Sequence, residues 1–250
     1  MEKLELPTPL GPVWLWGRAR GRPTLLIVTG AFADAGVMDH FARLLPQIDV
    51  LRTHLPGNHC PPLSETSIAA YAAALDEALR QAVPGPLAVL GISAGALVAL
   101  GLRAPNLAGL LLIEPPLFTE DVGALAQGVD AAKDPRFMHA IFGVADGQVV
   151  EPRDYSPLLD GLAAPAEVLL GDRPATQRPQ GRLPSLVGER ARRALAACPR
   201  VTVTTAPGAG HHIAADAGQV FVGGLQRLLA CLGVAIRADT PADEDEIGGR

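Results

Sequence analysis

Several features that mark specialised classes of protein are missing from this 250-residue sequence. Aromatic residues make up only 4% of it, so Ala, Val, Leu and Ile must build the core. The three cysteines, Cys60, Cys198 and Cys231, form no CxxC pair and no metal-ligand spacing. Their odd number suits a reducing compartment better than a disulfide scaffold. With no phosphate-cradling glycine loop either, we expect a cytoplasmic protein without a metal or a cofactor.

Long apolar runs and an excess of positive charge are also missing. No apolar stretch reaches the roughly 18 residues of a membrane helix, and the N-terminal segment has a proline where a signal peptide needs its apolar region. The 21 Lys and Arg against 26 Asp and Glu give a net charge of -5, which disfavours a basic face for nucleic acid. We expect no membrane span, no nucleic-acid partner and a small-molecule acyl substrate. The sequence indicates no particular oligomeric state.

What the chain does contain is a regular alternation of short apolar runs and longer helix-like stretches. Each run ends in Gly, Pro or a polar turn, which is typical of βαβ units. Continuous apolar runs predict strands buried on both faces, hence a mostly parallel sheet flanked by helices. The predicted strands are residues 3–6, 12–17, 24–28, 49–52, 87–90, 110–113, 166–170 and 201–205, the first two forming an antiparallel edge. The predicted helices are residues 38–45, 64–82, 96–102, 185–197 and 216–233.

Two segments depart from this alternation. Residues 117–160 carry loosely patterned apolar residues with acids and glycines, which we interpret as a small helical cap inserted into the domain. Residues 238–250 are acidic and poor in apolar residues, which predicts a disordered tail. We therefore expect a single α/β domain over residues 1–237.

The sequence Gly91-Ile92-Ser93-Ala94-Gly95 lies between a predicted buried strand and a predicted apolar helix. This is the context of a nucleophile elbow, a sharp turn that holds its central serine at positive φ. The two glycines avoid a steric clash where the chain approaches itself. The backbone N–H of Ala94, at a helix N-terminus, is placed to stabilise an oxyanion. An ordinary serine on a glycine-rich turn is the alternative interpretation.

A nucleophilic serine needs a histidine to take its proton and a carboxylate to hold that histidine. Of six histidines, only His211 and His212 follow the last predicted strand, and the residue chemistry alone allows either. Two acids follow strand ends: Asp172, before the histidine strand, and Glu114, after the nucleophile. We favour Asp172 and keep Glu114 as the alternative acid.

These motifs, in this order, resemble the α/β-hydrolase fold superfamily over residues 10–233. Residues 28–32 resemble the oxyanion loop, residues 55–57 the D-x-P-G turn, and residues 171–172 the acid turn, without its usual two-residue spacing. Residues 208–211 resemble the G-x-G-H histidine loop, a match that selects His211. The resemblance implies Ser93 as nucleophile, His211 as base, Asp172 as acid, and the N–H groups of Ala31 or Phe32 and of Ala94 as the oxyanion hole.

The function that we expect is a serine hydrolase acting on a carboxylic ester or thioester through an acyl-enzyme, in the class of carboxylic ester hydrolases. A thioesterase, lactonase, C–C bond hydrolase or acyltransferase would use the same residues. A binding protein of this fold that does not catalyse a reaction is an alternative of another class.

Overall fold

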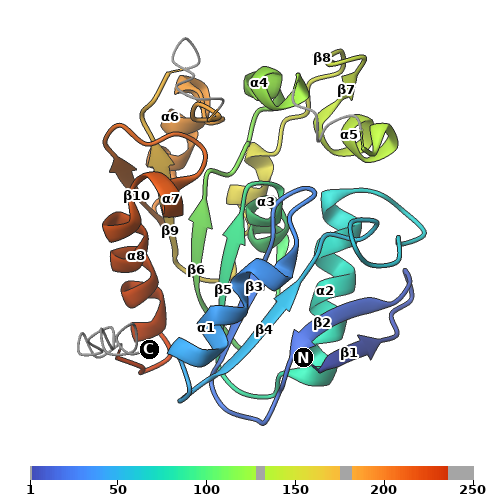
Figure 1. Ribbon diagram of the computed structural model, residues 1–250, viewed down its shortest axis with the longest axis vertical. Coiled ribbons are helices and arrows are strands. Elements are labelled where there is room, and N and C mark those ends of the chain that lie inside the picture. The colour runs from blue at the N-terminus through green and yellow to red at the C-terminus, as the bar shows by residue number, and fades with distance from the viewer. Residues whose placement is uncertain (1, 128–132, 175–181, 236–250) are drawn as a thin grey trace, which may run out of the picture.

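The structure, a computed structural model, describes residues 2–127, 133–174 and 182–235. Its centre is an eight-stranded sheet in the order β1-β2-β4-β3-β5-β6-β9-β10 (Figure 1). Strand β2 pairs antiparallel with both β1 and β4, and the other neighbouring strands pair in parallel. The strands are β1 (Lys3–Leu6), β2 (Val13–Gly17), β3 (Thr24–Val28), β4 (Asp49–Thr53), β5 (Leu87–Ile92), β6 (Leu107–Ile113), β9 (Ala166–Gly171) and β10 (Val201–Ala206). The predicted mostly parallel sheet with an antiparallel edge is confirmed.

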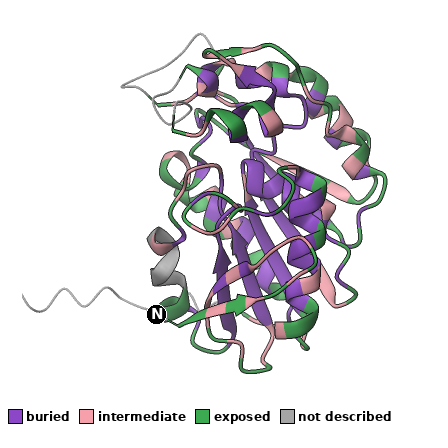
Figure 2. Cartoon of the chain, turned by 90° about the vertical axis from the view of Figure 1, so that its right-hand side faces the viewer, coloured by how far each residue is buried: buried purple, intermediate pink, exposed green. Residues whose placement is uncertain are grey.

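Helices cover both faces of this sheet, as predicted (Figure 1). Side chains alternate across each strand. Leu26 and Val28 of β3 therefore belong to the core under α2 (Ile68–Ala82) and α3 (Ala94–Gly101), while Leu25 and Ile27 belong to the core under α8 (Gly218–Ala230). Figure 2 shows the resulting buried layer of strands inside an exposed shell. The helices that pack along the sheet are α1 (Asp39–Leu44), α2 (Ile68–Ala82), α3 (Ala94–Gly101), α6 (Glu189–Ala197) and α8 (Gly218–Ala230).

Helices α2 and α6 begin later than the sequence predicts. Helix α2 begins at Ile68 because the Ser67 hydroxyl caps it, accepting from the N–H of Ala70. Helix α6 begins at Glu189 rather than at residue 185. The predicted closing helix over residues 216–233 is α8, which begins at Gly218, and a separate short helix, α7 (Ile213–Asp216), precedes it.

The segment between β6 and β9 lies beyond the carboxyl ends of the parallel strands (Figure 1). It forms η2 (Thr119–Val122), α4 (Gly123–Ala126), α5 (Pro135–Phe142), the hairpin β7 (Val144–Ala145) and β8 (Gln148–Val149), and η4 (Ser156–Leu159). Proline at its first turn and a left-handed Gly143 at its end delimit α5. The predicted tail at residues 238–250 lies outside the described residues. In the part of the chain that the structure describes, no helix is long and apolar enough to cross a membrane.

Candidate active site

Ser93 lies on the turn between β5 and α3, with φ 55° and ψ -122°. Its side chain makes no cap hydrogen bond to the helix that it precedes, so the hydroxyl is not used in the local structure. The backbone N–H of Ser93 donates to Ile113 O, at 2.8 Å, which fixes the turn to the end of β6. The residue is 5% exposed.

Two glycines make this turn possible. A Cβ on Gly91 would lie 2.7 Å from Ala96 Cα, and one on Gly95 would lie 2.4 Å from the carbonyl oxygens of both Val28 and Thr29. Because real Cβ atoms do not approach other atoms this closely, neither position accepts a side chain without moving the backbone. The predicted elbow geometry is thus present, and it requires the chain to pack closely against the end of β3.

His211 lies on the loop after β10 and is 7% exposed. Its backbone N–H donates to Leu183 O, at 3.2 Å. Two carboxylates hold the loop that precedes it: Asp172 Oδ1 accepts from the N–H of Gly208 at 2.6 Å, and Asp216 Oδ2 accepts from the N–H of Gly210 at 2.8 Å. His212, next along the chain, is exposed and lies at the start of α7.

The carboxylate beside His211 is that of Glu114, at the end of β6. Glu114 Oε2 lies 3.5 Å from His211 Nδ1, and the glutamate is 0% exposed. This separation exceeds a formed N–H···O hydrogen bond, and Nδ1 has no other hydrogen-bond partner among the described residues. Such contacts commonly shorten when substrate binds.

Asp172 lies elsewhere. It is exposed, and its carboxylate accepts a hydrogen bond from the backbone N–H of Gly208. The structure therefore brings Glu114, rather than the favoured Asp172, to the imidazole of His211. The reason is the local backbone: Glu114 has φ 50°, a left-handed conformation at the end of its strand. That turn coincides with a set of hydrogen-bond donors that receive the carboxylate.

Three donors reach the Glu114 carboxylate. Oε1 accepts from the N–H of Gly171 at 2.7 Å, and Oε2 accepts from the N–H of Leu186 at 2.8 Å. The hydroxyl of Ser185 lies 2.9 Å from Oε1 and 3.1 Å from Oε2. Hydrogen bonds of this kind stabilise the ionised form of a buried carboxylate. Sequence reasoning missed Ser185, because a serine ahead of a predicted helix is indistinguishable from an ordinary cap.

The predicted oxyanion donors divide into two groups. The N–H of Phe32 donates to Asn58 Oδ1 at 2.7 Å, so it is occupied within the protein. No hydrogen bond engages the N–H of Ala31 or of Ala94 within residues 2–127, 133–174 and 182–235. Gly30, next to Ala31, lies close to the serine: a Cβ on it would be 3.2 Å from Ser93 Cβ. Ala31 and Ala94 are thus the free donors of the predicted set.

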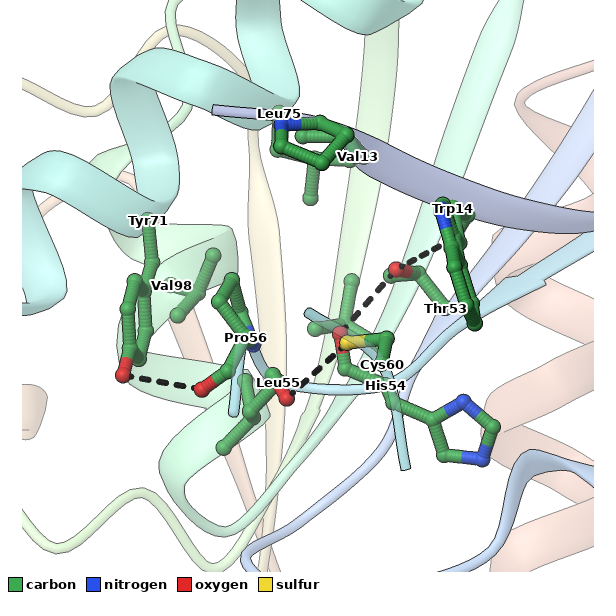
Figure 3. A pocket seen from close by; sticks show the side chains of 12 residues that line it. Val13, Trp14, Thr53, His54, Leu55, Pro56, Cys60, Tyr71, Leu75 and Val98 are labelled. Carbon is green, nitrogen blue, oxygen red and sulfur yellow. Dashed lines mark hydrogen bonds between the residues drawn. The ribbon is translucent and has the colours of Figure 1, made fainter. Parts of the chain in front are cut away.

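A small cavity lies near β2, β4 and α2 (Figure 3). Its volume is about 10 Å³, room for about one water molecule. Neither Ser93, Glu114 nor His211 lines it. Its wall includes Cys60, whose pKa burial raises to about 11, so this thiol is not a thiolate nucleophile at neutral pH. Among the described residues, no cluster of three or more His, Cys, Asp and Glu side chains forms a metal site.

The architecture is shared with solved structures of known hydrolases. A thermophilic esterase from Thermogutta terrifontis matches with a TM-score of 0.64 and 16% identity, over 94% of this chain and 100% of the esterase. The N-acyl homoserine lactonase AidH matches with a TM-score of 0.67 and 16% identity, over 93% and 97%. The carboxylesterase CesB from Bacillus subtilis matches with a TM-score of 0.66 and 15% identity, over 91% of each chain.

At these identities the likeness concerns the fold alone. Neither a protein-family model nor a curated protein sequence matches the chain. The chemistry must therefore be argued from its own residues.

Proposed function

From its α/β-hydrolase fold and the geometry around Ser93, we propose that this chain is a serine hydrolase that cleaves a carboxylic ester or thioester through an acyl-enzyme. The observation that carries the proposal is the combination of a strained, buried serine with a histidine–carboxylate pair. Ser93 is held at φ 55° with an uncommitted hydroxyl, and Ile113, whose carbonyl holds its N–H, directly precedes Glu114. A serine in this backbone conformation costs the fold conformational free energy, and such strained residues cluster at active sites.

The proposed first half-reaction forms the acyl-enzyme. Ser93 Oγ attacks the carbonyl carbon of the substrate while His211 Nε2 takes the hydroxyl proton. The N–H groups of Ala31 and Ala94 stabilise the resulting oxyanion, a contribution of about 10²–10³ in rate for one such donor. His211 then returns the proton to the leaving alcohol or thiol as the bond to the carbonyl carbon breaks.

The second half-reaction uses the same groups on water. His211 removes a proton from a water molecule as the water oxygen attacks the acyl carbon, and the proton returns to Ser93 Oγ as the acid leaves. In both halves the imidazole becomes positively charged, and the buried carboxylate of Glu114 offsets that charge. Glu114 therefore replaces Asp172 as the proposed acid, and Asp172 becomes a group that holds the histidine loop.

The substrate-binding region that we propose is the segment 117–160, acting as a cap over the carboxyl end of the sheet. Phe137 of α5 packs against Phe32, next to the proposed oxyanion hole, with ring centroids 5.4 Å apart. This contact places an apolar ring of the proposed cap beside the segment that carries the proposed oxyanion hole, which suits binding of an apolar acyl or alcohol group. The three free cysteines keep the cytoplasm as the proposed compartment.

Hydrolysis of p-nitrophenyl esters of increasing acyl length tests this function, with acyl thioesters and lactones as parallel substrates. Wild type should turn over at least one class, and Ser93→Ala and His211→Ala should each lose at least about 10³-fold in kcat. His212→Ala is the matched control and should keep most of the activity. Equal turnover by Ser93→Ala and wild type would refute the proposal, and a wild type inert toward all classes would favour a binding protein.

A further inference from the structure

Arg192, on α6, contacts the residues that hold the buried Glu114 carboxylate. Its Nη2 donates to Gly171 O, and it lies 3.1 Å from Ser185 Oγ. Its Nε donates to Val187 O at 3.1 Å. The guanidinium therefore ties the end of β9 to the segment 185–187, the two places from which donors reach Glu114.

The direction of these hydrogen bonds follows from the chemistry of the groups. An arginine side chain only donates, so Ser185 Oγ must accept from Arg192. The single hydroxyl proton of Ser185 is then free to point at Glu114, where both carboxylate oxygens lie within 3.1 Å. Arg192 thus orients Ser185, Ser185 holds Glu114, and Glu114 faces His211 Nδ1.

We propose that Ser185 and Arg192 are positioning residues that hold the Glu114 carboxylate in place beside His211 Nδ1, so that changing either one alters how readily the imidazole binds a proton. This inference rests on the proposed function for its role in catalysis, although the effect on His211 is measurable without turnover. The positive charge of Arg192 opposes protonation of the groups near it, because a cation disfavours further positive charge.

Two carboxylates on neighbouring segments have partners of their own. Asp216 pairs with Arg173 at 3.0 Å and Arg182 at 2.6 Å. Asp121 of η2 accepts from the N–H of Gly188 at 3.0 Å. His212 is a further titratable group here: although part of its surface is exposed, partial desolvation of its ring, and then the charge of His211, lower its pKa. Arg192 is thus linked to the Glu114 carboxylate through one intervening side chain, that of Ser185.

The test is the titration of the His211 ring, monitored by long-range ¹H–¹⁵N NMR in the full chain. The ring signals of His211 are assigned by their loss in His211→Gln. Arg192→Gln should move the midpoint to higher pH by about half a unit to one unit, since it removes one nearby charge. Ser185→Ala should move it in the same direction by a smaller amount, because the carboxylate loses a donor and holds the imidazolium more strongly. Arg192→Lys should restore most of the wild-type midpoint.

Arg193→Gln is the matched control, since Arg193 lies on the same helix with 71% of its side chain exposed and should leave the titration unchanged. Circular dichroism establishes that each variant is folded, and Ser185→Ala carries the test if Arg192→Gln is not. Midpoints in Arg192→Gln and Ser185→Ala that equal the wild-type value, or lie below it, would overturn the inference.

A kinetic readout separates this inference from the proposed function. If the wild type hydrolyses esters, the acid limb of kcat/KM should move to higher pH in Arg192→Gln, with kcat at its plateau reduced more than KM is changed. A wild type without turnover would refute the proposed function alone, because the NMR titration would still decide the role of Arg192.

Discussion

Glu114 is the residue on which the proposed chemistry most depends. It is fully buried, and its carboxylate accepts hydrogen bonds from Gly171, Ser185 and Leu186. It is also the carboxylate that the structure places beside His211 Nδ1. An ionised group in this environment costs free energy unless every oxygen is satisfied, so the arrangement favours a functional role over a purely structural one.

Glu114→Gln is therefore predicted to reduce kcat strongly, by about 10²-fold or more, because the imidazolium loses its counter-charge and an amide cannot fix the same tautomer. Asp172→Asn keeps an oxygen that can accept from Gly208, and it should retain activity within about tenfold of wild type. Both variants are compared by steady-state hydrolysis of one p-nitrophenyl ester. Loss of activity in Asp172→Asn with full activity in Glu114→Gln would reverse the assignment.

The sequence could not separate these two acids. Each lies just beyond a predicted buried strand, Glu114 directly and Asp172 after one glycine, and each precedes the histidine in chain order. What distinguishes them is distant in the chain: the φ of 50° at Glu114 and the donors of residues 185 and 186, more than 70 positions later. The sharp turn at Ser93, in contrast, was predictable because its strand, its turn glycines and its helix are contiguous.

At the scale of elements, the site depends on the parallel strands ending at a common edge. β5 presents Ser93, β6 presents Glu114, and β10 leads into His211, while β9 lies between β6 and β10. The strands were predictable from continuous apolar runs, since burial on both faces leaves little room for polar residues. The helix starts were less predictable, because capping by Ser67 and the use of Ser185 on Glu114 are not encoded in the apolar pattern.

Hydrogen bonds and an ion pair made by charged side chains hold the loop that carries His211. Asp172 holds Gly208 and Asp216 holds Gly210, while Arg173 joins the two ends, donating to Gly208 O at 2.6 Å and pairing with Asp216. Asp216→Asn should therefore loosen the histidine without removing a proposed reacting group. The expected result is a several-fold lower kcat with little change in KM for p-nitrophenyl esters. A change confined to KM would contradict this positioning role.

For the whole molecule, His54 links stability to pH. Its Nε2 accepts from the N–H of Ala35 at 2.8 Å, it is 6% exposed, and burial lowers its pKa below 6.5 although Asp34 opposes the shift. The unfolded chain therefore binds a proton more readily than the folded one. Folding stability is predicted to fall as the pH drops below about 6.5, by at most about 1.4 kcal/mol per pH unit for this group.

Differential scanning calorimetry between pH 7.5 and 5.5 measures this effect. The wild type should lose Tm on acidification, and His54→Gln, whose amide oxygen can accept from Ala35, should lose less. For a chain of this size the difference should be a few °C at most. Parallel curves for the two proteins would show that His54 does not contribute.

The central claim concerns the whole molecule as a catalyst: one buried serine becomes acylated. It is tested most directly by treating the protein with a fluorophosphonate and mapping the modified peptide by mass spectrometry. The account predicts one adduct per chain, located on Ser93 and absent from Ser93→Ala, with labelling slowed in Glu114→Gln. A wild type that takes up no label, or an adduct that persists in Ser93→Ala, would contradict it.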